Sequence, residues 1–134
     1  MKNLIKTTTF AIAAILLVST TSFAFGTKEK AIEKATEAVE NGAPDDWKLL
    51  TKQAEYLIKK DAGLATAKEW LDQSMEIKTN SYNLEVMGDY YAKCHLPKEA
   101  ANYYIKSIDA RKAELKDATA DTSDIQDKLV ALMK

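Results

Sequence analysis

Apolar residues recur at steps of three and four through most of the chain, and no stretch alternates apolar and polar residues for long. Spacing of this kind lines one face of a helix, whereas a half-buried strand requires a period of two. The pattern predicts helices over about 27–41, 46–61, 64–78, 81–94, 97–115 and 123–133, with the fifth ending between residues 112 and 115. The expected fold class is therefore all-α.

Turn and capping residues mark the ends of these helices. Asp45-Asp46 offers a carboxylate cap for the second helix, and Ser81 offers a hydroxyl cap for the fourth. Ser123 and Gln126 have the spacing of a capping box at the start of the last helix. We expect Gly42 to end the first helix in the left-handed conformation that glycine tolerates.

The first 24 residues differ from the rest of the chain. Lys2 and Lys6 precede an unbroken run of nine apolar residues, Phe10–Val18, and the small residues of Ser22-Phe23-Ala24 follow. This is the three-part layout of a secretory signal peptide, and nine residues are too few to cross a bilayer that needs roughly 20. We expect cleavage after Ala24, or nearby at Gly26, and a periplasmic or secreted protein without stable membrane insertion.

The remaining chain repeats itself at a spacing of 33–34 residues. Two helices recur in register, which predicts a two-helix unit that occurs twice, over about 46–78 and 81–113. In the first helix of the unit, Leu50, Ala54, Tyr56, Leu57 and Lys59 recur as Leu84, Gly88, Tyr90, Tyr91 and Lys93. In the second helix, Ala67, Trp70, Leu71, Ser74 and Met75 recur as Ala100, Tyr103, Tyr104, Ser107 and Ile108.

The period and the alternation of small and large residues resemble the tetratricopeptide repeat (TPR). Small residues such as Gly88 and Ala100 allow the two backbones to approach, and large residues one turn on, such as Tyr104, fill the space beside them. Gln53 and His95 depart from the residues usual in that family.

The resemblance implies a right-handed superhelix of antiparallel helix-turn-helix repeats within a single domain, residues 25–134. It has about two and a half repeats, because the helix over 27–41 reads as the second half of a preceding unit. The helix over 123–133 would cover the open end as a capping helix. The stretch 67–112 is also similar to short repeat tails of exported bacterial proteins of the Bacteroidetes type.

The same resemblance implies a binding surface. In TPR proteins the first helix of each unit faces the concave side. Here that side would carry Thr51, Ile58 and Ala92 together with several polar and charged residues. Glu55 and Asp89 stand where relatives that grip a C-terminal carboxylate carry Lys and Asn, so a carboxylate ligand is disfavoured. The candidate partner-binding residues are Lys48, Glu55, Lys59, Tyr82, Glu85, Asp89 and Lys93.

Charge and composition remove several function classes. Without the signal peptide the chain has 17 basic and 20 acidic side chains, a formal charge of −3 with no basic cluster in the sequence, which disfavours nucleic acid. Cys94-His95 has no second Cys or His to complete a metal site, and neighbours at a helix end point apart. We expect no enzyme, no cofactor and no metal.

The favoured interpretation is an exported, non-enzymatic module that binds a protein or peptide on the concave surface. One alternative is a carrier of a small apolar or aromatic ligand, with Trp and Tyr side chains lining a pocket between helices. Another is an oligomer that forms by end-to-end stacking through the first or last helix.

Overall fold

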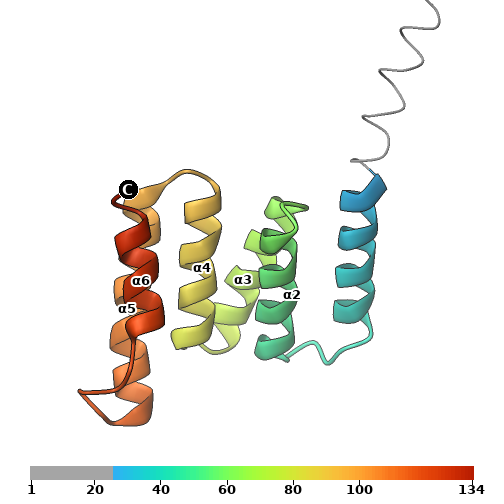
Figure 1. Cartoon of the computed structure of the whole chain (residues 1–134). Helices are drawn as coiled ribbons and strands as arrows, with labels where there is room; N and C mark the ends of the chain where they lie inside the picture. The colour runs from blue at the N-terminus through green and yellow to red at the C-terminus, as the bar shows by residue number, and fades with distance from the viewer. Residues whose placement is uncertain (1–25) are drawn as a thin grey trace, which may run out of the picture.

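The structure, a computed structural model, describes residues 26–134 and is all-helical over that range (Figure 1), which confirms the predicted fold class. The predicted signal peptide lies outside the described residues. An N-terminal helix covers 26–40 and five further helices follow. They are α2 (Trp47–Lys59), α3 (Leu64–Ile77), α4 (Ser81–Lys93), α5 (Pro97–Leu115) and α6 (Ser123–Ala131). None of the helices within 26–134 is both long and apolar enough to cross a membrane.

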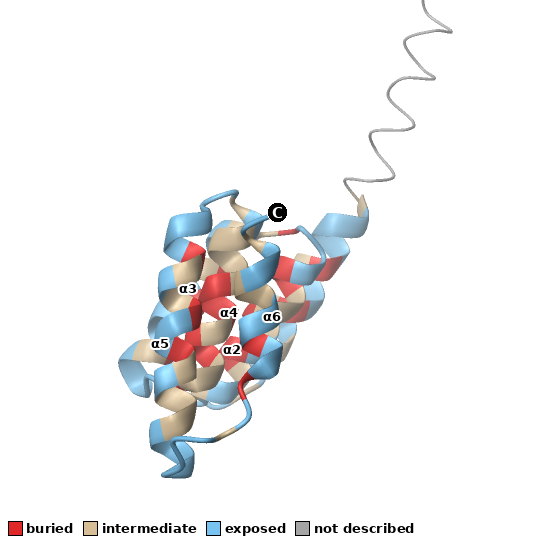
Figure 2. Ribbon diagram, turned by 60° about the vertical axis from the view of Figure 1, so that its left-hand side comes forward, coloured by how far each residue is buried: buried red, intermediate tan, exposed pale blue. Residues whose placement is uncertain are grey.

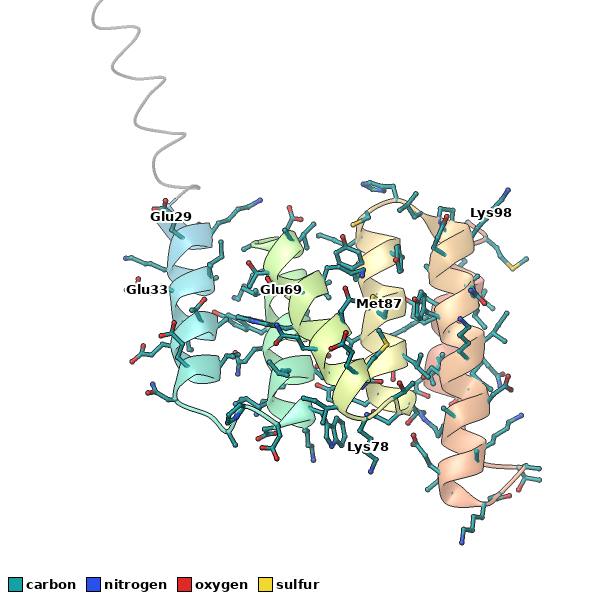
Figure 3. All side chains as sticks on the ribbon, turned by 180° about the vertical axis from the view of Figure 1, so that it is seen from behind. Glu29, Glu33, Glu69, Lys78, Met87 and Lys98 are labelled. Atoms are coloured by element: carbon teal, nitrogen blue, oxygen red, sulfur yellow. The ribbon has the colours of Figure 1, made fainter. Side chains whose placement is uncertain are left out.

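The helices form two layers. In Figure 1, α2, α4 and α6 lie toward the viewer and α3 and α5 lie behind them, and the view from behind in Figure 3 shows the reverse. The closest packing is within two helix hairpins, α2 with α3 and α4 with α5, and α4 joins them by packing on both α2 and α3. Helix α6 packs against α5 at the end of the row.

The apolar faces close into two clusters, and Figure 2 shows their buried positions in red together with the buried polar residues. The larger cluster lies between the N-terminal helix, α2, α3 and α4, and its fully enclosed members include Leu57, Leu71 and Met87. The smaller cluster joins Ala100 and Tyr104 of α5 to Ile125 of α6, whose side chain has no exposed surface. Burial of Ile125 therefore anchors α6 on the second hairpin.

Both hairpins contain the same hydrogen bond, donated by a buried serine. Ser74 Oγ of α3 donates to the Trp47 carbonyl at the start of α2 over 2.8 Å, and Ser107 Oγ of α5 donates to the Ser81 carbonyl at the start of α4 over 2.6 Å. Ser74 and Ser107 are the pair that recurs 33 residues apart in the sequence. Each serine thus ties the second helix of its hairpin to the first turn of the first helix.

Of the expected caps, one is confirmed and three are wrong. Asp46 Oδ1 accepts from the Leu49 N–H at 2.9 Å and caps α2 as expected. Ser81 does not cap α4. Asn80 does so instead, in a reciprocal capping box with Asn83, because its amide oxygen accepts from the backbone N–H groups at 82 and 83.

The expected box of Ser123 with Gln126 is also absent, since Ser123 is already helical. Thr122 is the N-cap of α6, and Gln126 Nε2 donates to its hydroxyl at 2.8 Å. Gly42 does not adopt the left-handed conformation. Its missing side chain has another use, because a Cβ there would collide with the Leu49 side chain.

Three helices end at a left-handed residue that is not glycine. Asp61, His95 and Lys116 have φ angles of 51°, 59° and 51°. In each case the following N–H donates back to a carbonyl of the last turn, as Leu96 does to Tyr91 at 2.9 Å. Asp61 and His95 are equivalent positions of the two hairpins. His95 therefore occupies a conformation for which glycine is the usual residue.

Candidate functional site

The seven predicted binding residues all come from α2 and α4, two of the three front-layer helices. With Lys128 of α6 and Arg111 of α5 they form a polar surface that we call the α2–α4–α6 face. The structure divides the seven residues into two bonded groups and two outer lysines.

The first group joins α2 to α4 through Glu55. Lys59 Nζ lies 2.7 Å from Glu55 Oε1, and the Tyr82 hydroxyl donates to Oε2 at 2.7 Å. Burial raises the pKa of Glu55, but the hydrogen bonds from Lys59 and Tyr82 outweigh it and hold that pKa below its usual range. Burial and the bond to Glu55 raise the pKa of Tyr82. At neutral pH this pair is thus a carboxylate accepting from a protonated phenol.

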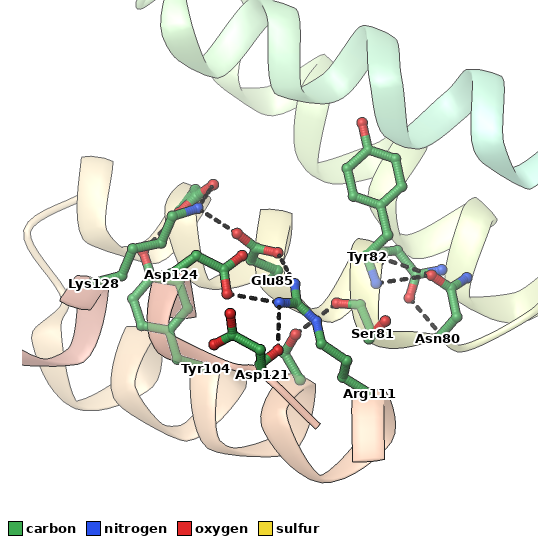
Figure 4. A network of polar contacts seen from close by, with 12 residues as sticks. Asn80, Ser81, Tyr82, Glu85, Tyr104, Arg111, Asp121, Asp124 and Lys128 are labelled. Carbon is green, nitrogen blue, oxygen red and sulfur yellow. Dashed lines mark hydrogen bonds and ion pairs between the residues drawn. The ribbon is translucent and has the colours of Figure 1, made fainter. Parts of the chain in front are cut away.

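The second group joins α4 to α5 and α6 (Figure 4). Lys128 Nζ lies 2.7 Å from Glu85 Oε1 and 2.9 Å from Asp89 Oδ2, so one ammonium group bridges two carboxylates one helical turn apart. Arg111 Nη2 lies 3.2 Å from Glu85 Oε2, and its Nη1 lies 2.6 Å from Asp124 Oδ1. Helix α6 is therefore held on α4 by charge as well as by the buried Ile125.

Tyr104 completes this second group from behind, since its hydroxyl donates to Asp89 Oδ1 at 2.7 Å. Burial and this bond raise the pKa of Tyr104. Burial lowers the pKa of Lys128, but the bonds to Glu85 and Asp89 more than reverse it and leave the pKa raised. The side chains of Glu85, Asp89 and Lys128 remain 15%, 21% and 36% exposed, so they are fixed in position but still reach solvent.

The two outer lysines are open to solvent. Lys93 lies 3.7 Å from Asp61, which also pairs with Lys28 of the N-terminal helix at 3.2 Å. Lys48 lies in the first turn of α2 and forms no ion pair within residues 26–134. With Asp46 and Lys52 it lines a shallow concavity of about 230 Å³.

The resolved pKa shifts on this face all move away from the range in which a side chain exchanges protons at neutral pH. On the α2–α4–α6 face the pKa of the carboxyl Glu55 is lowered, and the pKa values of Lys128 and of the two phenols are raised. Each shift leads away from neutrality, whereas a general acid or base works best with a pKa near the operating pH. Every buried polar side-chain atom among the described residues also has a hydrogen-bond partner.

The aromatic side chains pack mainly on one another and between helices. Trp70 and Tyr104 are 7% and 3% exposed, and the rings of Tyr91 and Tyr103 stack at 5.3 Å between centroids. Cys94 is half-buried at the end of α4, and no group of three or more His, Cys, Asp or Glu side chains converges within residues 26–134.

Sequence reasoning missed the partners from the C-terminal half, Arg111 and Lys128. Both are cations on amphipathic helices. Nothing in its local spacing distinguishes Lys128 from the other lysines, and Arg111 is distinguished only as the one arginine of the sequence. Glu85 has no basic residue three or four positions away on α4, and this unpaired carboxylate is the signal that could have suggested a cation from elsewhere.

No family model matches the chain, and neither a curated protein nor a solved structure matches it. The side chains of the α2–α4–α6 face are thus the guide to function.

Proposed function

We propose that this chain is an exported, TPR-like, non-enzymatic interaction module that holds a protein or peptide on the α2–α4–α6 face. The repeat assignment is supported by two hairpins with the same buried serine bond and the same left-handed ending, at Asp61 and His95. These shared bonds come from positions that recur in the sequence, which is the expected signature of a helical repeat unit.

The observation that carries the binding proposal is the Lys59–Glu55–Tyr82 group. It is a charged cluster on the surface, its carboxylate is 26% exposed, and its geometry is set by two different helices. Side chains already held in one arrangement lose little entropy when a partner binds, so such a cluster favours a specific contact. Glu55 retains acceptor capacity for a backbone N–H or a basic side chain of the partner.

Helix α6 narrows the proposed contact area. It already occupies Glu85 and Asp89 through Lys128, so the part open to a partner is the α2–α4 half. That half carries Lys48, Glu55, Lys59 and Tyr82. A short surface of this size fits a modest affinity for an extended or helical segment, in which shape and a few polar contacts set specificity.

Site-specific photo-crosslinking in the native host cell tests this proposal. A crosslinking residue at Lys48 or Lys59 should trap one defined protein, and the same residue at Glu69 should not. Glu69 is the matched control because it is an exposed residue of the back-layer helix α3 (Figure 3). Combining Glu55→Gln and Tyr82→Phe should lower the yield at Lys48 without unfolding the chain. Equal products from position 69, or none from 48 and 59, would contradict the proposal.

The alternative, a carrier of a small apolar ligand, has one feature in its favour. A concavity of about 300 Å³ lies between the end of the N-terminal helix and α2, with Val39, Leu49 and Leu50 in its lining. Trp47 lies one turn before Leu50 on α2, so its fluorescence should change saturably with a long-chain fatty acid if this function holds. An unchanged fluorescence spectrum over the solubility range of the fatty acid would contradict the carrier function.

A further inference from the structure

A third concavity, of about 400 Å³, lies between the start of the N-terminal helix and the end of α2. Its volume is in the range of small-ligand sites. It is lined by Thr27, Lys28, Lys30, Ala31, Lys34, Tyr56 and Lys60. Four of these seven residues are lysines and none is acidic, although acidic residues outnumber basic ones in residues 26–134.

The lysines converge on one aromatic ring from two helices. Lys34 of the N-terminal helix and Lys60 at the end of α2 each place an ammonium group 5.8 Å from the centre of the Tyr56 ring. The two ammonium groups are therefore at most twice that distance apart. The ring attracts each cation weakly but does not cancel its charge.

Most of these lysines form no ion pair within the described residues. Lys28 pairs with Asp61 at 3.2 Å. Lys30, Lys34 and Lys60 form no ion pair with any residue of the described part of the chain, and all three are exposed. Three like charges around one concavity repel each other, and a bound anion would relieve that repulsion.

We propose that this concavity binds a small organic phosphate, with the phosphoryl oxygens among Lys30, Lys34 and Lys60 and the organic part against the Tyr56 ring. Lysine ammonium groups are established point-charge binders of phosphate. A phosphate monoester carries about −1.5 to −2 charges at pH 7 and so balances three lysines better than a single carboxylate does. This site lies outside the α2–α4–α6 face and is independent of the function proposed above.

Titration of the purified protein with three probes tests the site, with amide chemical shifts and calorimetry as readouts. Phenyl phosphate supplies the charge and a ring, inorganic phosphate the charge alone, and benzyl alcohol the ring alone. We expect phenyl phosphate to bind with half-saturation below about 1 mM and to shift residues around Tyr56. Inorganic phosphate should bind the same residues more weakly, and added salt should weaken both. Saturation by benzyl alcohol alone, or none by phenyl phosphate, would overturn the proposal.

A pair of double variants separates a site from general charge attraction. Lys34→Gln with Lys60→Gln should weaken phenyl phosphate binding about tenfold or more, roughly the loss of 1.4 kcal/mol. Lys52→Gln with Lys98→Gln removes the same charge from exposed positions outside the concavity and should leave binding unchanged. Equal losses in both doubles, or no loss in the first, would overturn the site. Circular dichroism checks that both variants fold, as expected for substitutions at exposed positions.

Discussion

The Tyr104 ring lies directly against the backbone of Gly88, so that a Cβ atom at residue 88 would come within 2.5 Å of ring atom Cδ1. Real side chains do not tolerate such an approach. The equivalent positions of the first hairpin hold Ala54 and Leu71, both fully buried. The smaller leucine leaves room for the extra methyl group, and the larger tyrosine requires its absence. The two hairpins therefore fill the same inter-helix contact with different pairs of residues: a glycine with a tyrosine in one, and an alanine with a leucine in the other.

This pairing predicts a coupled mutational effect. Gly88→Ala alone should destabilise the protein by about 1–3 kcal/mol, because it overpacks the contact with Tyr104. In a Tyr104→Leu background the same change should be neutral or stabilising, since alanine is the better helix former by about 1 kcal/mol. Urea unfolding of the four proteins of this cycle measures the coupling. Equal costs of Gly88→Ala in both backgrounds would show that the ring does not set the need for glycine.

Substituting glycine at a left-handed helix end should raise stability. His95→Gly should stabilise by about 1 kcal/mol, because a residue with a side chain pays that order of strain at φ 59°. Lys116→Gly, at φ 51°, should do the same. Thermal unfolding checks both. Lys98→Gly serves as the control: it lies in the right-handed first turn of α5, so glycine there should destabilise instead.

The two repeated serine bonds should not be of equal importance. Ser107→Ala removes one hydrogen bond, to the Ser81 carbonyl, and should cost about 1 kcal/mol. Ser74 also bonds the Thr51 hydroxyl at 2.7 Å and accepts from Asn83 Nδ2 at 3.1 Å. Ser74→Ala should therefore cost more, about 2 kcal/mol, because it disturbs a buried network. Chemical denaturation measures the free energy of unfolding that each variant loses. A larger loss in Ser107→Ala than in Ser74→Ala would contradict this prediction.

Lys128 should hold α6 on α4. Lys128→Gln leaves Glu85 and Asp89 without their shared cation and should cost about 1 kcal/mol, with the loss shrinking as salt screens the charges. Amide hydrogen exchange should speed up in α6 and stay unchanged in α2. Lys98→Gln removes an exposed lysine without an ion pair among the described residues and should leave exchange unaltered. Uniform acceleration across the chain would argue against a local tether.

An alkaline titration should separate the six tyrosines. The pKa values of Tyr82 and Tyr104 lie above the ordinary 10.0 in the folded state. Their contribution to stability is therefore complete below about pH 10 and is lost as the pH rises beyond it, because the unfolded phenols ionise first. Absorbance at 295 nm should show a late phase that accompanies unfolding. Tyr82→Phe should shrink that phase, and an undiminished late phase in this variant would contradict the prediction.

Local patterns predicted the helices well. The apolar spacing placed all the described helices to within a few residues, since a helix must bury one face wherever it packs. The caps were less predictable, because Ser81 and Asn80 are both good capping residues and only the chain path selects one. The left-handed conformation of His95 was likewise not predictable from the sequence, because it follows from the turn between two packed helices and not from a preference of histidine.

The sequence by itself determined that the chain is helical and roughly where each helix lies, because both depend on spacing along the chain. It also placed Glu55, Tyr82, Glu85 and Asp89 on α2 and α4. Only the tertiary structure decided which of these remain open to a partner. Arg111 and Lys128 reach Glu85 across 26 and 43 positions of sequence, and charge pairing at that separation is set by helix packing alone.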